Sequence, residues 1–293
     1  MDSLGIHLTR RSARAVCVSS DGTIREAASA DASDAAAALR EALTHVAASK
    51  SFDAAAVAAS DGGEIDLDAA VRLLRETTGL QDAQAVNAGA AAIVAEEWIG
   101  AATGARDAIC LWIGDEVLAG ILLAGKPWRG AHGMAGSAAW LALNPVERQD
   151  YRKFGSLAAE VSNKGIARRL AWRIQAGDHS AVLERAGDLD AITASHVFDG
   201  ARSGDGVSIS VVRETAKYIG MAVANLVAAL DPEVVVLGGP VAAAGDLLIE
   251  PVRQEYARRL PPALAEQCRC EMSPLGADGV AIGAAHLAAL QPR

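Results

Sequence analysis

Hydrophobic and polar residues alternate at the start of the chain, over residues 3–9 and 14–18, as they do in half-buried strands. Asp21-Gly22 is a hairpin turn signal, so we expect paired strands to open the chain. The elements expected next are a helix at 31–48, a strand at 52–59, a helix ending near Thr78 that Asp66 or Asp68 could cap, a strand at 83–86 and a helix at 90–99.

A second series with a similar order follows the first. Its expected elements are strands at 107–113 and 117–123, a turn at Gly125-Lys126-Pro127, a glycine-rich loop at 129–136, helices at 156–176 and 208–230, a strand at 234–237, a helix at 245–258, a strand near 269–273 and a closing helix at 279–290. This rough duplication of one α/β unit predicts an N-terminal lobe over 1–104, completed by a closing helix at 280–293, and a C-terminal lobe over 105–279. A central cleft that grips a ligand by closure suits such a pair of lobes.

Composition narrows the class of protein. Of 293 residues, 51% are hydrophobic and only 4% are aromatic, which predicts a sizeable core packed largely by small side chains. The net charge of −9 counts against a nucleic-acid partner, and no apolar run approaches the roughly 18 residues of a membrane span. The N-terminus lacks a signal-peptide pattern, so we expect a cytoplasmic protein without a membrane partner. Four cysteines, none in a C-x-x-C pair, are expected to be buried or free thiols: Cys17, Cys110, Cys268 and Cys270.

Six segments of the chain carry a resemblance to a known family. They are Gly5 to Leu8, Val86 to Glu96, Ile113 to Ile121, Trp128 to Gly136, Asn225 to Gly239 and Asp278 to Ala285. In this order they resemble the ROK family (repressor, open reading frame, kinase) of sugar kinases. The resemblance implies a two-lobed α/β fold of the actin-like ATPase (ribonuclease H-like) type, a small sugar-like ligand, and a homodimer or homotetramer. ROK repressors carry an N-terminal helix-turn-helix, whereas this sequence starts on a strand, so we expect no repressor.

The family's catalytic aspartate is replaced here. In ROK kinases this residue accepts the proton of the sugar hydroxyl, and the matching position holds Ala88. A methyl group cannot accept a proton, and a general base typically contributes about 10²–10⁴-fold in rate. Asn87, which precedes it, matches the family and is expected either to bind a sugar hydroxyl or to cap the following helix.

Both phosphate-binding turns of the family also differ. Thr9-Arg10-Arg11-Ser12 stands where the family has glycine-glycine-threonine, and His7 stands at the strand-end aspartate. Asp115 and Glu116 occupy the second hairpin, where two carboxylates would repel a triphosphate unless they held a cation. Adjacent strand residues point to opposite faces, so these two are not expected to share one ion.

The sugar and zinc positions are altered as well. Ser137 and Trp140 replace the family's glutamate and histidine, and Ser156 stands at its last zinc cysteine. Since no cysteine lies between Cys110 and Cys268, we expect zinc to be absent.

Together these changes favour a protein inactive as an ATP-dependent sugar kinase, which binds a small sugar-like or anionic ligand in the cleft with a regulatory or scaffold role and needs no cofactor. One alternative is a non-kinase enzyme that uses the same cleft for different chemistry. Another is an active, glucokinase-like kinase with relocated catalytic residues that uses ATP and magnesium. The ligand-binding candidates are Asn87, Ser137, Trp140, Arg10 and Arg11. The candidates for other chemistry are His7, His132, Asp115 and Glu116. Gly238 and Gly239 are expected to be the remnant of a nucleotide pocket.

Overall fold

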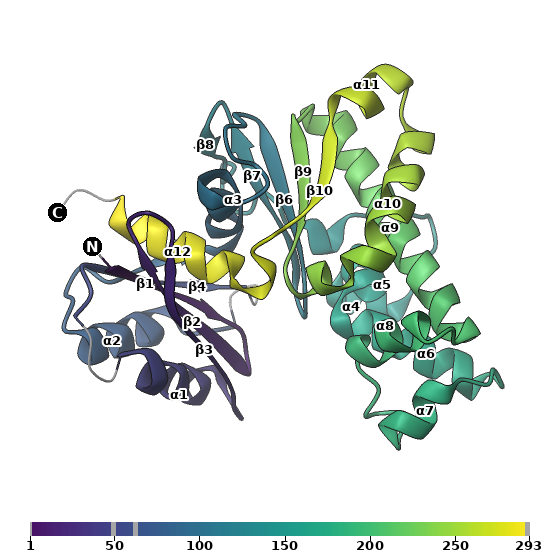
Figure 1. Ribbon diagram of the computed structural model, residues 1–293, viewed down its shortest axis with the longest axis horizontal. Coiled ribbons are helices and arrows are strands. Elements are labelled where there is room, and N and C mark those ends of the chain that lie inside the picture. Colours follow the sequence, from purple (N-terminus) through teal and green to yellow (C-terminus); the bar gives the residue numbers. More distant parts are fainter. Residues whose placement is uncertain (1, 48–50, 61–63, 291–293) are drawn as a thin grey trace. The chain divides into compact units, whose positions relative to one another are not determined.

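The computed structural model describes residues 2–47, 51–60 and 64–290 (Figure 1). The chain forms two compact units. Unit 1 comprises Met1–Cys110, Ala119–Gly136 and Ser273–Arg293, and unit 2 comprises Leu111–Leu118 and Ser137–Met272. The lobe boundaries expected from the sequence stay a prediction.

The first sheet belongs to unit 1 and has the strand order β3-β2-β1-β4-β5. β1 pairs antiparallel with β2 and parallel with β4, and β4 pairs parallel with β5. The carboxyl ends of β1, β4 and β5 therefore meet at one edge of this sheet. The strands are β1 (Asp2–Leu8), β2 (Ser12–Ser19), β3 (Ile24–Asp31), β4 (Ala54–Ala59) and β5 (Gln84–Asn87).

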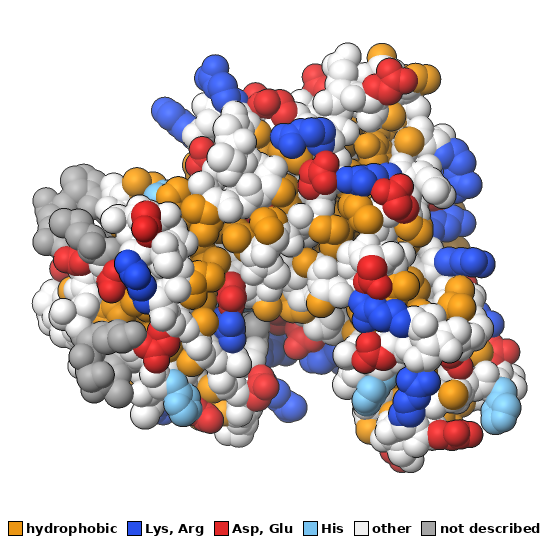
Figure 2. Space-filling model, viewed as in Figure 1, with side chains coloured by type: hydrophobic (Ala, Val, Ile, Leu, Met, Phe, Trp, Pro, Cys, Tyr) orange, Lys and Arg blue, Asp and Glu red, His pale blue; other side chains and the backbone are white. Residues whose placement is uncertain are grey.

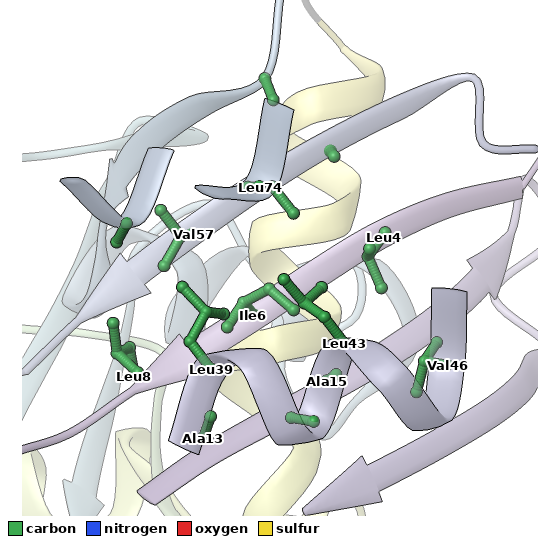
Figure 3. Close-up of a cluster of buried hydrophobic side chains, with 14 of the residues drawn as sticks. Leu4, Ile6, Leu8, Ala13, Ala15, Leu39, Leu43, Val46, Val57 and Leu74 are labelled. Atoms are coloured by element: carbon green, nitrogen blue, oxygen red, sulfur yellow. The ribbon is translucent and has the colours of Figure 1, made fainter. Parts of the chain in front are cut away.

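Helices cover both faces of this sheet. α1 (Ala35–Ala47) and α2 (Leu67–Thr78) lie on one face, and α12 (Gly279–Ala289) lies on the other, beside α3 (Ala88–Ile99) (Figure 1). Side chains of β1, β2 and α1 interdigitate in the core between the sheet and α1, as Leu4, Ile6, Leu39 and Leu43 show in Figure 3. On the opposite face α12 approaches so closely that a side chain at Gly5 would collide with the carbonyl oxygen of Ala281. This contact is an example of the small-residue packing expected from the composition.

The second sheet has the strand order β10-β9-β6-β7-β8. β9 and β10 pair in parallel, and β7 and β8 pair antiparallel. The strands are β6 (Ala108–Ile113), β7 (Val117–Leu123), β8 (Lys126–Pro127), β9 (Val234–Gly238) and β10 (Arg269–Met272). The helices of unit 2 are α4 (Gln149–Phe154), α5 (Ser156–Val161), α6 (Asn163–Gln175), α7 (Ala181–Ala186), α8 (Ala194–Arg202), α9 (Gly206–Leu230), α10 (Gly245–Arg259) and α11 (Pro262–Gln267). Short 3-10 turns are η1 (Ala138–Trp140) and η2 (Pro240–Ala244) in unit 2, and η3 (Gly276–Asp278) in unit 1.

Several elements differ from the sequence prediction. A third strand, β3, joins the opening pair, and the single helix predicted over 156–176 is broken at Ser162, whose hydroxyl caps α6 by accepting from the Gly165 N–H. Lys126 and Pro127 form the short strand β8 rather than the turn itself, because the positive φ values fall at Ala124 and Gly125. The expected cap of α2 is confirmed as Asp66, which accepts from the Ala69 N–H.

Charge and hydropathy are distributed in the manner of a globular protein. Acidic and basic side chains are interspersed on the face shown in Figure 2. Within the described ranges, no helix is both long and apolar enough to cross a membrane. All four cysteine side chains are buried, as expected.

Candidate functional site

A pocket of about 410 Å³ lies within unit 2. Its size is in the range typical of sites for small organic ligands. The first turns of α6 and α8 form part of its wall, and η2, directly after β9, closes another side. The lining residues are Asp115, Asn163, Lys164, Ala167, Ile192, Thr193, Ala194, Ser195, Phe198, Arg202, Pro240 and Ala243.

The turn between β9 and η2 depends on glycine. Gly239 has φ of +86°, and a Cβ built on it would lie 2.7 Å from the carbonyl oxygen of Ile113 at the end of β6. Glycine meets both conditions without strain, and Pro240 then begins η2. Gly238 and Gly239 do not line the pocket, but this turn brings Pro240 and Ala243 into its wall.

The hairpin between β6 and β7 is tied to the start of α6. The Asn163 N–H donates to the Gly114 carbonyl at 2.8 Å, and its side-chain amide donates to Asp115 Oδ1 at 3.2 Å. These two bonds hold the exposed Asp115 at the mouth of the pocket. The neighbouring Glu116 is half-buried and does not line it.

Two cations reach the pocket, and their surroundings differ. Arg202 is held by Asp246 at 2.7 Å and Asp199 at 3.1 Å, so its charge is largely balanced. These bonds, the one to Asp246 foremost, raise the pKa of the guanidinium further. Lys164 is exposed on the first turn of α6 and pairs with no carboxylate among residues 2–47, 51–60 and 64–290. Its ammonium is therefore available to an anionic ligand.

A second group of polar side chains lies at the carboxyl edge of the first sheet, in unit 1. His7 is only 7% exposed, and its Nε2 lies 2.8 Å from the hydroxyl oxygen of Ser60, which follows β4. Burial lowers the pKa of His7 to about 4, so the ring is neutral at physiological pH. Asn87 ends the adjacent strand β5, in register with Ala59.

Asn87 caps α3. Its Oδ1 accepts from the Ala90 N–H at 2.9 Å, which confirms the capping expectation. A hydrogen bond between the Asn87 side chain and a sugar hydroxyl stays a prediction. Ala88 follows as the first residue of α3 and is 3% exposed.

The turn at Thr9-Arg10-Arg11-Ser12 is closed by its own polar groups. The Thr9 and Ser12 hydroxyls lie 2.7 Å apart, and the Thr9 N–H donates to the Ser12 carbonyl at 2.8 Å. Arg10 pairs with Glu64 at 2.5 Å, both side chains being mostly exposed. Arg11 is exposed as well. The anion grip predicted for these two arginines stays a prediction.

The remaining predicted site residues are spread over a loop and η1. His132 is exposed in the glycine-rich loop, which belongs to unit 1, and Ser137 is exposed directly after it, at the start of a segment of unit 2. Trp140 ends η1 and is 58% exposed, so it does not pack in a core. The structure brings His7 close to Ser60, and Asp115 into the pocket, without placing these loop residues in either group.

The residues near Ser156 do not fit a zinc ion. Gly155, Ser156 and Leu157 carry no zinc ligand, and hydrogen bonds and ion pairs hold the neighbouring segment instead. Glu160 receives bonds from Tyr151 at 2.6 Å and Arg148 at 2.9 Å.

Comparison with known proteins places the chain in a family. A model described as the ROK family matches residues 50–291. The chain belongs to the ROK family. A glucokinase from Halalkalibacterium halodurans is 33% identical to it over 66% of the chain and 59% of its own length. A xylose repressor from Caldicellulosiruptor bescii is 30% identical over 67% of the chain and 49% of its own length. The chain thus spans less than two thirds of each of these relatives.

A solved structure confirms the fold expected from the sequence. The ROK family glucokinase from Streptomyces griseus, in complex with glucose and AMPPNP, superposes with a TM-score of 0.85 over 99% of this chain and 100% of that one, at 22% identity. At this identity the likeness speaks for the fold alone. The two mixed sheets with helices are those of an actin-like ATPase domain.

The comparisons contradict our expectation of an inactive, kinase-like binding or scaffold protein. The matching relative from H. halodurans is named a glucokinase, and the S. griseus glucokinase holds glucose with AMPPNP. The expectation rested on the combined replacement of the base at position 88, of both phosphate-binding turns and of the sugar and zinc positions. A general base accounts for only part of an enzyme's rate, so its loss alone does not remove the reaction.

Apart from Asp115, the residues that line the pocket were not among the candidates named from the sequence. Asn163 and Lys164 were hidden inside a predicted continuous helix, although Ser162 is a typical N-cap residue and signalled the break. Thr193 is a second such signal, because it caps α8 in a capping box with His196. No motif in the sequence around Ser60 indicated a functional role for it.

Proposed function

We propose that this protein transfers the terminal phosphoryl group of ATP to a hydroxyl of a sugar. The observation that carries the proposal is the unit 2 pocket, which combines apolar walls with two helix N-termini and the available Lys164. The family and the names of its glucokinase relatives support the same reaction.

The pocket has the chemistry that a nucleotide requires. Ile192, Phe198 and Pro240 offer apolar surface to a flat base. The first turns of α6 and α8 present backbone N–H groups, whose partial positive charge favours phosphate oxygens. Lys164 adds a full positive charge from the same turn of α6.

Kinase activity is compatible with the absence of a base at position 88, because of the way phosphoryl transfer proceeds. Phosphoryl transfer passes through a loose transition state, so positioning and charge neutralisation supply most of the rate. An enzyme without the family's aspartate is then slower, by up to about 10²–10⁴-fold, and still a kinase. We therefore propose a slow sugar kinase, with magnesium–ATP as its phosphoryl donor.

The pocket can be tested by filling it. Ala167→Trp places an indole in the pocket wall, and Gln175→Trp places the same side chain on the exposed end of α6, outside it. We expect Ala167→Trp to weaken ATP binding in calorimetric titration by about 10-fold or more, the equivalent of about 1.4 kcal/mol. Gln175→Trp should bind as the wild type does. Equal ATP affinity in all three proteins would contradict the assignment of this pocket.

We also propose that the protein acts in the cytoplasm as a homo-oligomer. The cytoplasm supplies both ATP and the reducing conditions that suit four buried thiols. Large exposed apolar side chains in unit 2 suit a subunit contact. They are Trp140, Val146, Phe154 and Trp172. Light scattering tests this directly, and a monomer at micromolar concentration would contradict it.

A further inference from the structure

The His7–Ser60 pair is a buried polar contact between two neighbouring parallel strands. His7 lies near the end of β1, in register with Ala58 of β4, and Ser60 is two residues further along. Their side chains meet at 2.8 Å, with His7 7% and Ser60 9% exposed. Burying these two polar groups costs desolvation energy, which an apolar side chain at the same position would not incur.

The pair lies where a ligand is expected in an α/β fold. Ligands of such sheets bind outside the carboxyl ends of parallel strands, and His7, Ser60 and Asn87 follow from three adjacent ones. Side chains alternate between faces along a strand, so His7 lies on the face of β1 opposite Leu4 and Ile6. It therefore points away from the core formed with α1.

The charge of the arginine beside His7 on β2 is balanced. Arg14 of β2 is its cross-strand partner, and an unpaired guanidinium there would oppose protonation of the ring. Asp278, directly before α12, pairs with this guanidinium. The neighbouring cation is thus neutralised, which leaves the imidazole able to take up a proton.

We propose that Ser60 and His7 form a proton relay that accepts the proton of the reacting sugar hydroxyl, in place of the carboxylate that position 88 lacks. This relay rests on the proposed kinase function, and it identifies Ser60 and His7 as the residues that carry out the proton transfer in that reaction. It explains how the chain keeps proton acceptance although Ala88 cannot supply it.

The step balances in atoms and electrons. The sugar oxygen forms a bond to the γ-phosphorus of ATP, and the bond from that phosphorus to the bridging oxygen breaks, with its electron pair leaving on ADP. The hydroxyl proton passes to Ser60 Oγ while the Ser60 proton passes to His7 Nε2. The products are a sugar phosphate, ADP and an imidazolium, which later releases its proton to water.

The basicity of His7 suits its proposed role as the proton acceptor. Burial holds its pKa at about 4, close to the 3.9 of an ordinary aspartate, the group that the resemblance assigns to this role. The relay thus offers a proton acceptor of similar strength on a different strand. Because the proton reaches His7 only through Ser60, the relay supplies part of the rate that a carboxylate in direct contact with the hydroxyl gives.

The relay is tested by removing each of its two groups and then by introducing a carboxylate at position 88. His7→Gln keeps a hydrogen-bonding side chain but is not a base, and Ser60→Ala removes the relaying hydroxyl with little change in volume. We expect each to lower kcat for sugar phosphorylation by about 10²-fold, with little change in KM for ATP. Adding Ala88→Asp to His7→Gln should restore kcat, because a carboxylate then takes the proton directly.

The outcomes separate the relay from the function on which it rests. If the wild type is active and both single variants keep kcat within about threefold, the relay is wrong and the kinase proposal stands. If His7→Gln loses activity that Ala88→Asp does not restore, although the double variant unfolds at the same urea concentration as the wild type, the relay is wrong as well. A wild type without any sugar-dependent ADP formation overturns both proposals.

Discussion

The phenol of Tyr151 donates a 2.6 Å hydrogen bond to Oε1 of Glu160, a carboxylate whose side chain is 2% exposed. Burial first, and the bond to Glu160 next, raise the pKa of Tyr151, so the phenol keeps the proton that it donates. Arg148 at 2.9 Å and Arg169 at 3.5 Å supply the opposite charge. Glu160 thus joins α5 to α4 and α6 in the segment where zinc ligands are missing.

Removing this charge should destabilise unit 2 strongly. Glu160→Gln leaves the buried Arg169 guanidinium with only the half-exposed Glu214 as an ion-pair partner, and breaking a buried ion pair from one side costs about 3–5 kcal/mol. We expect a loss of that order in the free energy of unfolding by urea. The control is Glu147→Gln, which breaks a pair with Arg152 that is 75% exposed on both sides and should change stability by less than about 1 kcal/mol. Equal effects of the two substitutions would show that the Glu160 network is not what holds this segment.

A carboxylate at position 88 should speed the reaction. Ala88→Asp restores the residue type that the family uses as a base, and its place in the first turn of α3 suits a negative charge. We expect kcat for sugar phosphorylation to rise by about 10²-fold. Ala90→Asp puts the same charge in the same turn on another side of the helix and should leave kcat near the wild-type value. An unchanged kcat for Ala88→Asp would show that this position does not face the reacting hydroxyl.

His7 should make stability depend on pH in a defined window. Its pKa falls from 6.5 to about 4 on folding because burial penalises the imidazolium. Between these values the unfolded chain binds a proton that the folded protein does not, so stability decreases as pH falls from about 6.5 to about 4, by about 3 kcal/mol in all. Urea unfolding across this range should show a flatter profile for His7→Gln than for the wild type. His132→Gln, at an exposed histidine, should follow the wild-type profile; a parallel profile for His7→Gln would refute this account.

The glycine-rich loop offers a matched pair of glycines. Gly136 has φ of +83°, and a Cβ there would collide with the Ala119 carbonyl oxygen, whereas Gly133 has φ of +71° and a Cβ there would meet only Arg129 Nη2, at an ordinary 3.9 Å. Both alanine variants incur backbone strain of about 1 kcal/mol, and Gly136→Ala adds the collision. We therefore expect Gly136→Ala to lose more than about 2 kcal/mol of stability in thermal unfolding, clearly more than Gly133→Ala. Similar losses would mean that β7 can shift to accept the new methyl group.

The sequence predicted the fold well because its signals are local. Strand alternation and the Asp66 cap are read directly from neighbouring positions, and the abundance of alanine predicted the small-residue packing seen between Gly5 and α12. β3 was missed because its residues, Ile24–Asp31, are mostly exposed and include three alanines, which weakens the strand pattern. The break at Ser162 was missed because the apolar spacing continues across it.

The sites were harder to predict, since they depend on contacts between distant residues. His7 and Ser60 are 53 positions apart, and only the parallel register of β1 and β4 brings them together. Asp115 and Asn163 are 48 positions apart and meet through the hairpin and the start of α6. A resemblance to a family identifies which functional residues are replaced, but it does not show which other residues of this chain perform their function.

The central claim is that this chain phosphorylates a sugar, and the most direct test follows both products at once. Purified protein with magnesium–ATP and each of a set of hexoses and N-acetylhexosamines should be monitored by phosphorus NMR over hours, which a slow enzyme requires. The account predicts that one of these sugars yields ADP and a sugar phosphate in equal amounts, and that Ala167→Trp suppresses both. Intact ATP with every sugar, under conditions in which a ROK glucokinase consumes it, would contradict the account.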